Sequence, residues 1–559
     1  MTATAQSPTA GSGLWRRQLY HYPDTRARMT YLAIVVLATI VLYYALYIPG
    51  AVSPSIIAHY GMTFNYYVYI IVVSNAVGAF GSLAAGLADR WGRANLVAYG
   101  LVIVGLLVLF GVPNAPNKWA YAIIFSVVGI VEGVILVATP ALVRDFSPQL
   151  GRASAMGFWT LGPVIGSLVV AVVSSNTLSH LTAWQDQFII CGIVVLVVAA
   201  IALVGLRELS PQLRDQLMVS MRDRALIEAR ARGLKVQELT RRPWRQMLRP
   251  DIVGSAFAIS VFLLIYYTAV GFFTVYFTTL HGFSLSTANS LGNWFWAFDA
   301  GALIIIGVIS DRVGVRKPFM VLGAVGAIIM TIIFLNLGKG TGYSTFAVVI
   351  SIAAVFLAIA YAPWMASYTE TIEKHNPALT ATGLAVWGWI IRAVIAISFL
   401  IMPAVVSSMT PLVTYGSSVQ TLATRYAPEL ATLKAIDPAT LAALQANPTN
   451  VTAAAKAVGE IATTFHISLA AATARLTALA TVPKSDLAFL NAHGTQVTAA
   501  AAAAPGQWKN WWWVCVGGEV VFIPLTLLMA GRWSPRRARE DAEEHERLVQ
   551  REMEKLSTT

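Results

Sequence analysis

The chain contains little charge and almost no cysteine. Only 12% of its 559 residues are Asp, Glu, Lys or Arg, whereas soluble globular domains contain about 25%. Hydrophobic residues make up 57% of the chain, which excludes an ordinary soluble enzyme. The two cysteines, Cys191 and Cys515, both lie inside apolar runs. We therefore expect neither a disulfide framework nor a thiolate metal centre.

Further absences narrow the function. No Gly-x-x-x-x-Gly-Lys-Ser/Thr motif is present, so no ATP-driven step is expected. None of the eight histidines is followed by Asp five residues later, which disfavours a membrane acyltransferase. No stretch is typical of a cytoplasmic signalling domain, which disfavours a membrane sensor that transports no solute. We expect no enzyme, no metal and no cofactor, and we attribute the net charge of +12 to loops rather than to nucleic-acid binding.

Long apolar runs, by contrast, are abundant. Twelve of them are long enough to cross a hydrocarbon core of about 30 Å as helices, which satisfy their own backbone groups in lipid. We predict an all-α membrane protein with twelve transmembrane helices in two pseudo-symmetric six-helix halves. The approximate spans are 30–57, 64–88, 94–113, 118–143, 153–174, 187–207, 252–280, 286–310, 317–337, 344–368, 379–408 and 509–531.

Basic residues recur at alternate turns, which places those turns and both termini in the cytoplasm of a multi-pass plasma-membrane protein. The stretch 409–508 is rich in Ala and Thr and is interrupted by prolines, so we predict a helical insert outside the cytoplasm. The predicted division is a cytoplasmic N-terminal segment (1–29), a six-helix half (30–207), a basic linker forming amphipathic helices (208–250), spans 7–11 (251–408), the insert (409–508), span 12 (509–531) and a charged cytoplasmic tail (532–559).

A charged turn occurs twice. Asp89-Arg90-Trp91-Gly92-Arg93 follows span 2, and Asp311-Arg312-Val313-Gly314-Val315-Arg316 follows span 8, at an offset of 311 − 89 = 222 residues. Tyr43-Tyr44 and Tyr266-Tyr267 repeat at 266 − 43 = 223 residues. This near-constant offset indicates two similar halves, the plan of secondary transporters whose substrate site lies between the halves.

The first turn resembles the signature loop of the major facilitator superfamily, Gly-x-x-x-Asp-Arg-x-Gly-Arg. Gly162-Pro163-Val164-Ile165-Gly166 is similar to a Gly-Pro-x-x-Gly motif of proton-coupled antiporters in that superfamily. The sequence departs from the pattern at Ala85, where the first Gly is expected, and at Ala94, where a second basic residue is usual. Span 4 lacks the arginine of sugar porters at membrane depth, which disfavours sugar uptake.

The resemblance implies that the charged turns act as gates that hold the two halves together in the outward-facing state, through carboxylate–guanidinium pairs. The alternative is that these charges only set the topology. The predicted gating residues are Asp89, Arg90, Gly92, Arg93, Arg144 and Asp145 in the first half and Asp311, Arg312, Gly314, Arg316 and Glu370 in the second.

Ionisable residues also lie deep inside the predicted spans. Glu132, Asp299 and Arg392 are each 12 residues from the cytoplasmic end of their span, which is about 18 Å at ~1.5 Å per residue. A charge at this depth costs at least about 2.5–3.5 kcal/mol, so it is functional by default. Glu519 lies similarly deep in span 12; a partner in span 9 and a functional role are both open.

We predict Glu132 and Asp299 as the proton-coupling residues, because a buried carboxyl group can take up and release a proton as access alternates. Arg392 stays charged and needs an anion, which could be Asp299 or a substrate carboxylate or phosphate. Aromatic and amide side chains at this depth suit a partly apolar organic ligand. With Arg392, the predicted substrate-binding residues are Asn293, Trp296, Trp387, Tyr43, Tyr44, Tyr266 and Tyr267.

The sequence thus predicts a secondary active transporter that couples protons to a small organic solute, either an organic anion or an amphiphilic aromatic compound. Gly162-Pro163 favours antiport efflux, whereas Arg392 favours proton-symport uptake of a carboxylate metabolite. The expected partners are the solute, protons and the lipid bilayer, with no nucleic acid, and a monomer is favoured.

Overall fold

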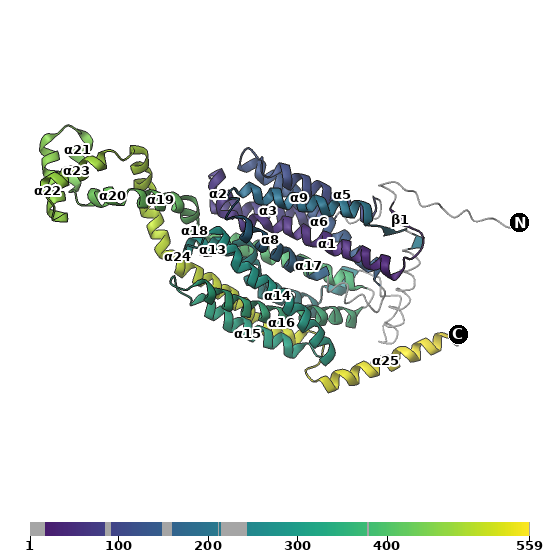
Figure 1. Ribbon diagram of the computed structural model, residues 1–559. Helices are drawn as coiled ribbons and strands as arrows, with labels where there is room; N and C mark the ends of the chain where they lie inside the picture. Colours follow the sequence, from purple (N-terminus) through teal and green to yellow (C-terminus); the bar gives the residue numbers. More distant parts are fainter. Residues whose placement is uncertain are drawn as a thin grey trace. The chain divides into compact units, whose positions relative to one another are not determined.

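The computed structural model describes residues 17–83, 91–147, 159–210, 212–213, 243–376 and 379–557. The chain divides into two compact units. The first, which we call the bundle, comprises Met1–Val405 and Trp508–Thr559, and the second, the insert unit, comprises Val406–Gln507. Figure 1 shows the bundle as long helices side by side, with the first half in purple to blue and most of the second in teal to green.

The first half of the bundle departs from the predicted spans at its first turn. The run predicted as one span over 30–57 is broken at Val52, because α1 ends at Ala51 and α2 begins at Ser53 with a proline in its first turn. Proline is tolerated there since its missing N–H would have no helical partner. The helices are α1 (Thr25–Ala51), α2 (Ser53–Tyr60), α3 (Phe64–Leu83), α5 (Arg93–Leu106) with a π-helical turn (Leu107–Gly111), α6 (Lys118–Phe146), α8 (Gly162–Thr177) and α9 (Trp184–Gly205).

The second half contains one helix that belongs to both units. This helix, α24 (Lys484–Leu525), begins in the insert unit and ends in the bundle, where a 3₁₀ turn (Thr526–Leu528) follows it. The other helices are α11 (Pro243–Met247), α12 (Pro250–Phe262), α13 (Leu264–Leu280), α14 (Leu285–Val313), α15 (Lys317–Leu335), α16 (Tyr343–His375), α17 (Thr380–Val405) and the tail helix α25 (Pro535–Ser557).

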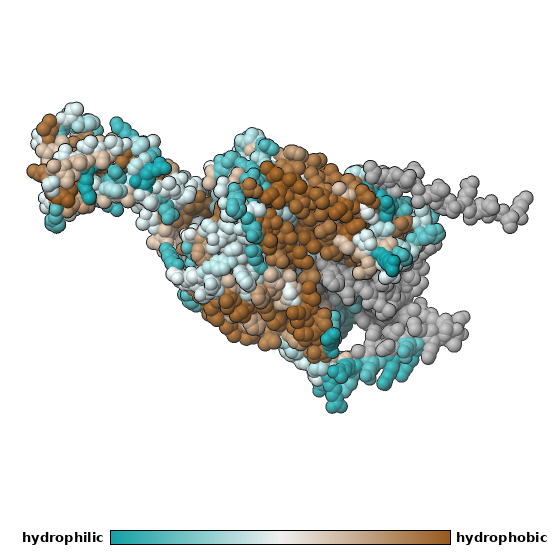
Figure 2. Space-filling view, viewed as in Figure 1, coloured by the Kyte–Doolittle hydropathy of each residue, from teal (hydrophilic) through white to brown (hydrophobic). Residues whose placement is uncertain are grey.

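The number of spans is lower than predicted when only the described residues are considered. Ten helical segments there are long and apolar enough to cross a membrane, or eleven if α2 and α3, bent by 113°, form one span. Helix α8 stands at the predicted fifth span but has only 16 described residues. Figure 2 shows apolar side chains gathered over α5 and α9 and over α15 and α16, where Ile193, Val204, Leu322 and Ile329 are exposed. The fold is therefore that of a multi-pass helical membrane protein.

The insert unit is a set of short helices around a small apolar core. The core residues are Ile436, Ala457, Ile461, Ala472 and Leu479. The helices, which precede the first part of α24, are α18 (Met409–Pro411), a π-helical turn (Leu412–Gly416), α19 (Ser417–Arg425), α20 (Ala427–Lys434), α21 (Pro438–Ala446), α22 (Val451–Phe465) and α23 (Leu469–Ala480).

The structure also contains two short strands where the sequence analysis placed loop or helix. Strand β1 (Gln18–Leu19) precedes α1, and β2 (Glu208–Leu209) follows α9 at the start of the predicted linker. The strands pair in parallel, with Gln18 opposite Glu208. Most of the predicted helical linker, residues 211 and 214–242, lies outside the described residues.

Candidate functional site

The two halves of the bundle meet through polar contacts at one end, which we call the Ser175 end. The Ser286 hydroxyl donates to the carbonyl oxygen of Ser175 (2.6 Å), and the Asn293 amide donates to the Ser175 hydroxyl (3.0 Å). The Asn289 amide donates to the carbonyl oxygen of Ala51 (3.0 Å). Asn293, which the sequence predicted to bind substrate, is thus part of the contact between the halves.

The same end is also closely packed by apolar groups. A Cβ atom added to Gly50 of α1 would lie 2.5 Å from the carbonyl oxygen of Val270 in α13, so the two helices touch through backbone. The rings of Phe64 and Phe272 contact each other across the halves, with centroids 5.6 Å apart. In this structure the halves are closed against each other at the Ser175 end.

Gly50→Ala is expected to weaken this closure. The added methyl group overpacks a tight contact, which costs about 1–3 kcal/mol, so the ratio of open to closed states should rise about 5-fold or more. The measurement is the rate at which an impermeant maleimide labels Ala288→Cys, because Ala288 is 3% exposed at the interface. Gly301→Ala is the control, since its Cβ meets nothing within 4 Å. An unchanged rate in Gly50→Ala would contradict the expectation.

A cluster of tyrosines joins the two halves. The ring centroids of Tyr43 and Tyr47 are 5.4 Å apart, and those of Tyr266 and Tyr267 are 5.3 Å apart. Tyr43 interacts electrostatically with Tyr267 and with Tyr361 of α16. We call these five residues the tyrosine cluster. Tyr47 and Tyr361 were not predicted, although Tyr47 follows Tyr43 by four residues and therefore shares its helix face.

The predicted mid-membrane charges surround the tyrosine cluster. Tyr43 lies within electrostatic range of both Glu132 of α6 and Arg392 of α17. Tyr361 lies within range of Asp299 of α14. One carboxyl group from the first half and a carboxyl group and a guanidinium from the second half therefore all lie within electrostatic range of the tyrosine cluster.

These charges are shielded from solvent and weakly partnered. Glu132 is 2% exposed and Asp299 is 4% exposed, and Oε1 of Glu132 accepts no hydrogen bond from the described residues. Arg392 is half-buried. Within the described ranges, no carboxylate lies within 4.0 Å of its guanidinium, so the predicted alternative of an Arg392–Asp299 ion pair is not formed there. This arrangement can accept an anion and protons from outside the chain.

The other predicted binding residues differ in their surroundings. The Trp296 ring packs against Tyr266 (centroids 5.0 Å apart) and adds an aromatic wall to the tyrosine cluster. Trp387 packs against Trp364 of α16 (5.4 Å). Tyr44 is fully buried, and it interacts with Cys191 of α9 rather than with the three charges.

The Gly-Pro motif of the fifth span has a packing role beside this cluster. A Cβ atom at Gly166 would lie 2.6 Å from Cβ of Tyr43, and one at Gly162 would lie 2.6 Å from Cγ2 of Thr39. Pro163 occupies the first turn of α8, where proline is tolerated. The two glycines therefore allow α8 to lie directly against α1 at Tyr43.

In the first half, three of the predicted gating residues come together. Nη1 of Arg93 at the start of α5 lies 2.7 Å from Oδ2 of Asp145 near the end of α6. The side chains are 13% and 7% exposed, so this pair is less screened than a surface ion pair. Gly92 precedes Arg93 as the N-cap of α5. Asp89, Arg90 and the side chain of Arg144 lie outside the described residues.

Glu208 of β2 is a contact of this group that the sequence did not predict. Its Oε2 accepts a hydrogen bond from the backbone N–H of Arg93 at 2.6 Å, and its side chain is 2% exposed. Burial lowers the pKa of the neighbouring Arg17, and interactions with Tyr99 and Glu208 oppose that shift. An acidic residue in a charged linker carries no sequence pattern that would have identified it.

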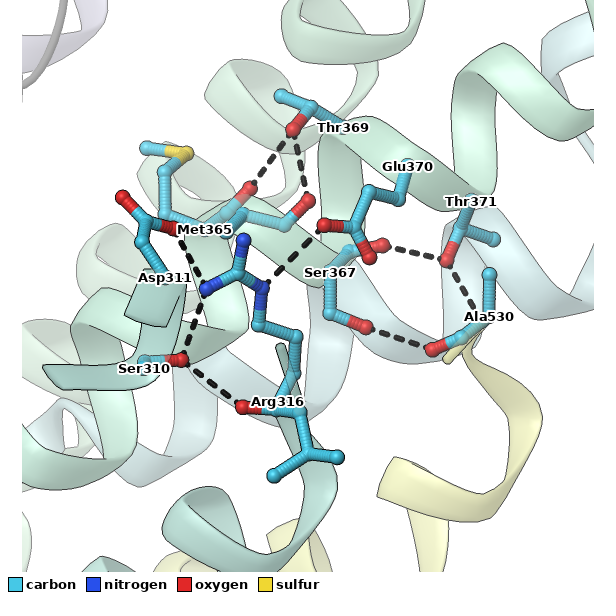
Figure 3. Close-up of polar contacts among 11 residues, drawn as sticks. Ser310, Asp311, Arg316, Met365, Ser367, Thr369, Glu370, Thr371 and Ala530 are labelled. Carbon is cyan, nitrogen blue, oxygen red and sulfur yellow. Dashed lines mark hydrogen bonds and ion pairs between the residues drawn. The ribbon is translucent and has the colours of Figure 1, made fainter. Parts of the chain in front are cut away.

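In the second half, Arg316 joins two carboxylates. Nη1 lies 2.7 Å from Asp311 and donates to the Ser310 hydroxyl at 2.8 Å, while Nε lies 3.2 Å from Glu370. Figure 3 shows the Arg316 guanidinium between Asp311 of α14 and Glu370 of α16. Asp311 is 70% exposed and Glu370 43%, so each pair contributes only about 0–1 kcal/mol.

Two further predicted gating residues flank this group. Gly314 ends α14 with φ 76°, and Arg312 is exposed. Both charged groups, one around Arg93 and one around Arg316, connect helices of their own half. Within the described ranges, the ion pairs of these two groups do not join one half to the other.

Glu519, the fourth deep ionisable residue, has the partner in span 9 that the sequence left open. Its Oε1 accepts a hydrogen bond from the Thr331 hydroxyl of α15 at 2.9 Å, and its side chain is fully buried. No group of three or more His, Cys, Asp or Glu side chains within the described ranges is placed to hold a metal ion.

Residues 35–398 match the family model described as Major Facilitator Superfamily. The chain belongs to this superfamily. The family predicted from the charged turn is therefore confirmed. Major facilitator proteins are transporters rather than enzymes, and the expectation that the protein is not an enzyme is confirmed with it.

Two curated relatives are fungal transporters. The "MFS transporter asaE" of Aspergillus flavus is 26% identical over 157 residues, which cover 26% of this chain and 35% of that protein. The "Fujikurins efflux protein" of Gibberella fujikuroi is 30% identical over 177 residues, which cover 31% of this chain and 37% of that protein. The chain spans about a third of the length of the curated relatives it matches.

Solved structures of major facilitator transporters share the fold over most of the chain. A bacterial homologue of the human lysosomal transporter Spinster, inward-facing and unoccupied, is 15% identical with a TM-score of 0.55, over 92% of this chain and 100% of that one. Its occupied form is 16% identical with a TM-score of 0.57, over 90% and 98% of the two chains.

Proposed function

We propose that this major facilitator protein is a secondary active transporter that couples protons to a small organic solute by alternating access. The observation that supports the proposal is the tyrosine cluster, which brings Glu132 of the first half together with Asp299 and Arg392 of the second. Charged groups deep in a membrane protein usually mark an ion or substrate pathway.

Each group has a role that its chemistry allows. Arg392 holds the anionic group of the solute, because a guanidinium stays charged and presents paired donors. Glu132 and Asp299 exchange protons with whichever side is open, and the tyrosine hydroxyls and Trp296 line the solute. In an alternating-access cycle, closure of the Ser175 end goes with access to the cluster from the opposite end, which carries Arg93 and Arg316.

The same proposal covers gating and topology. The residues around Arg93 and around Arg316, which pair within their own halves in this structure, contact the opposite half at their end of the bundle in the outward-facing state. That end and both termini lie in the cytoplasm, in line with the concentration of basic residues at alternate turns. The protein acts as a monomer in the plasma membrane, and the insert unit lies outside the cytoplasm.

Two modes of coupling are favoured by different observations. Antiport efflux is favoured by the Gly-Pro motif at Gly162 and by similarity to a relative named as an efflux protein. Proton-symport uptake of a carboxylate metabolite is favoured by Arg392, since a half-buried guanidinium without a carboxylate partner among the described residues suits a carboxylate ligand.

Proteoliposomes with an imposed pH gradient distinguish the two modes. The probes are labelled benzoate and citrate as carboxylates and ethidium as an amphiphilic aromatic compound. If the protein is a symporter, the probe should accumulate inside the vesicles when the outside is acidic. If it is an antiporter, the probe should accumulate inside when the inside is acidic. Protein-free liposomes correct for passive diffusion of benzoic acid. If neither gradient drives flux above this background and Glu132→Gln changes nothing, proton coupling is wrong.

A further inference from the structure

The segment before α1 is attached to the end of α9 by backbone and side-chain hydrogen bonds. The N–H of Glu208 donates to the carbonyl oxygen of Arg17 (3.1 Å), and the N–H of Ser210 donates to that of Leu19 (2.8 Å). Nη1 of Arg17, whose side chain is 2% exposed, donates to the carbonyl oxygen of Ala202 in the last turn of α9 (2.8 Å). We call the paired residues 17–19 and 208–210 the clip.

The clip places Glu208 at the N-terminus of α5. Helix N-termini leave backbone N–H groups without helical partners and favour negative charge. The N-cap residue Gly92 has no side chain to supply a cap, and Oε2 of Glu208 accepts from the N–H of Arg93 instead. A carboxylate distant in sequence therefore replaces the usual local cap.

Gly92 is shaped to accept this carboxylate. Its φ of 88° lies in the region that favours glycine. A Cβ atom at this position would lie 2.2 Å from Oε1 of Glu208. The glycine of the signature turn thus provides both the backbone conformation and the space for the Glu208 side chain.

Arg93 is consequently held through both its backbone and its side chain. Glu208 binds its backbone N–H, and Asp145 binds its guanidinium at 2.7 Å. We propose that Glu208 is a positioning residue for Arg93, and that the clip is the means by which the segment before α1 fixes Glu208 in place. This inference rests on the proposed gating role of Arg93, because Glu208 is proposed to act on the gate through that residue.

The proposal predicts how variants shift the equilibrium between the states that are open and closed at the Ser175 end. The readout is maleimide labelling of Ala288→Cys in the full-length protein, which requires no substrate and reports opening at the Ser175 end. Glu208→Ala is expected to change the labelling rate about 3-fold or more, in the same direction as Arg93→Gln. A chain that starts at Tyr22 and so lacks β1 should show the same change, even if Glu208→Ala fails to fold.

Combined variants distinguish positioning from a general loss of stability. If Glu208 acts through Arg93, the double variant Arg93→Gln/Glu208→Ala should show the same labelling rate as Arg93→Gln alone. If the two residues act independently, the two fold-changes in labelling rate should multiply. Glu540→Gln is the control for loss of an acidic charge, because Glu540 is exposed on α25.

The outcomes separate the two levels of the proposal. Suppose that Arg93→Gln changes the labelling rate, but that Glu208→Ala and the shortened chain both leave it unaltered. That result would overturn the positioning role of Glu208 and preserve the gating role of Arg93. Multiplying effects would likewise overturn it. An unchanged rate in Arg93→Gln would overturn both.

Discussion

Glu132→Gln is expected to abolish accumulation of solute driven by a pH gradient while leaving exchange of solute across the membrane intact. The amide cannot take up or release a proton, so the proton gradient no longer acts on the solute. Coupling between two ligands is typically worth about 1–3 kcal/mol, so accumulation should fall about 5- to 150-fold. Asp299→Asn should behave in the same way, because Asp299 is as deeply buried and reaches the same tyrosine cluster.

Gradient-driven accumulation and exchange without a gradient are measured in the same proteoliposomes. Glu519→Gln is a matched control, because Glu519 is equally buried but hydrogen-bonded to Thr331. It should retain driven accumulation. Full accumulation in both Glu132→Gln and Asp299→Asn would show that neither residue couples protons, and loss of exchange as well would indicate a structural role.

The fold could be predicted from the sequence because a bilayer leaves few options. Long apolar runs must be helices in lipid, since no water is available to satisfy the backbone. The break at Val52 was missed because the prediction followed hydropathy over the whole run, although Pro49, Gly50 and Pro54 flank the break. Glycine and proline mark changes in backbone direction, and a window of average hydropathy does not use that signal.

The candidate site could be predicted in part for a related reason. A charge at mid-membrane costs so much free energy that each such residue points to a function by itself, without a surrounding motif. This argument identified Glu132, Asp299 and Arg392. Tyrosine is common near membranes, so Tyr361 could be recognised only once the structure brought it within electrostatic range of Tyr43. The role of Glu208 depends on two strands distant in sequence, and no spacing rule connects residue 18 with residue 208.

Arg392→Ala is expected to remove stabilisation of the protein by carboxylates. A ligand at 100 times its Kd stabilises a protein by about 2.7 kcal/mol, which raises the unfolding temperature in a thermal-shift assay with benzoate or citrate. Truncating one partner of a buried charge pair costs about 2–5 kcal/mol. That loss weakens binding about 30-fold or more, so about two thirds or more of the stabilisation, and of the upward shift, should be lost at the same ligand concentration.

Two comparisons make the Arg392 prediction specific. Arg392→Lys should recover only part of the stabilisation, because an ammonium group cannot reproduce the planar, two-pronged contact of a guanidinium with a carboxylate. Arg312→Ala is the control for removing a positive charge, since Arg312 is exposed and should leave the carboxylate effect unchanged. If carboxylates stabilise Arg392→Ala as much as the wild type, the anion does not bind at Arg392. Stabilisation by ethidium alone, unaffected by Arg392→Ala, would instead favour a neutral or cationic aromatic solute held by the tyrosine cluster and Trp296.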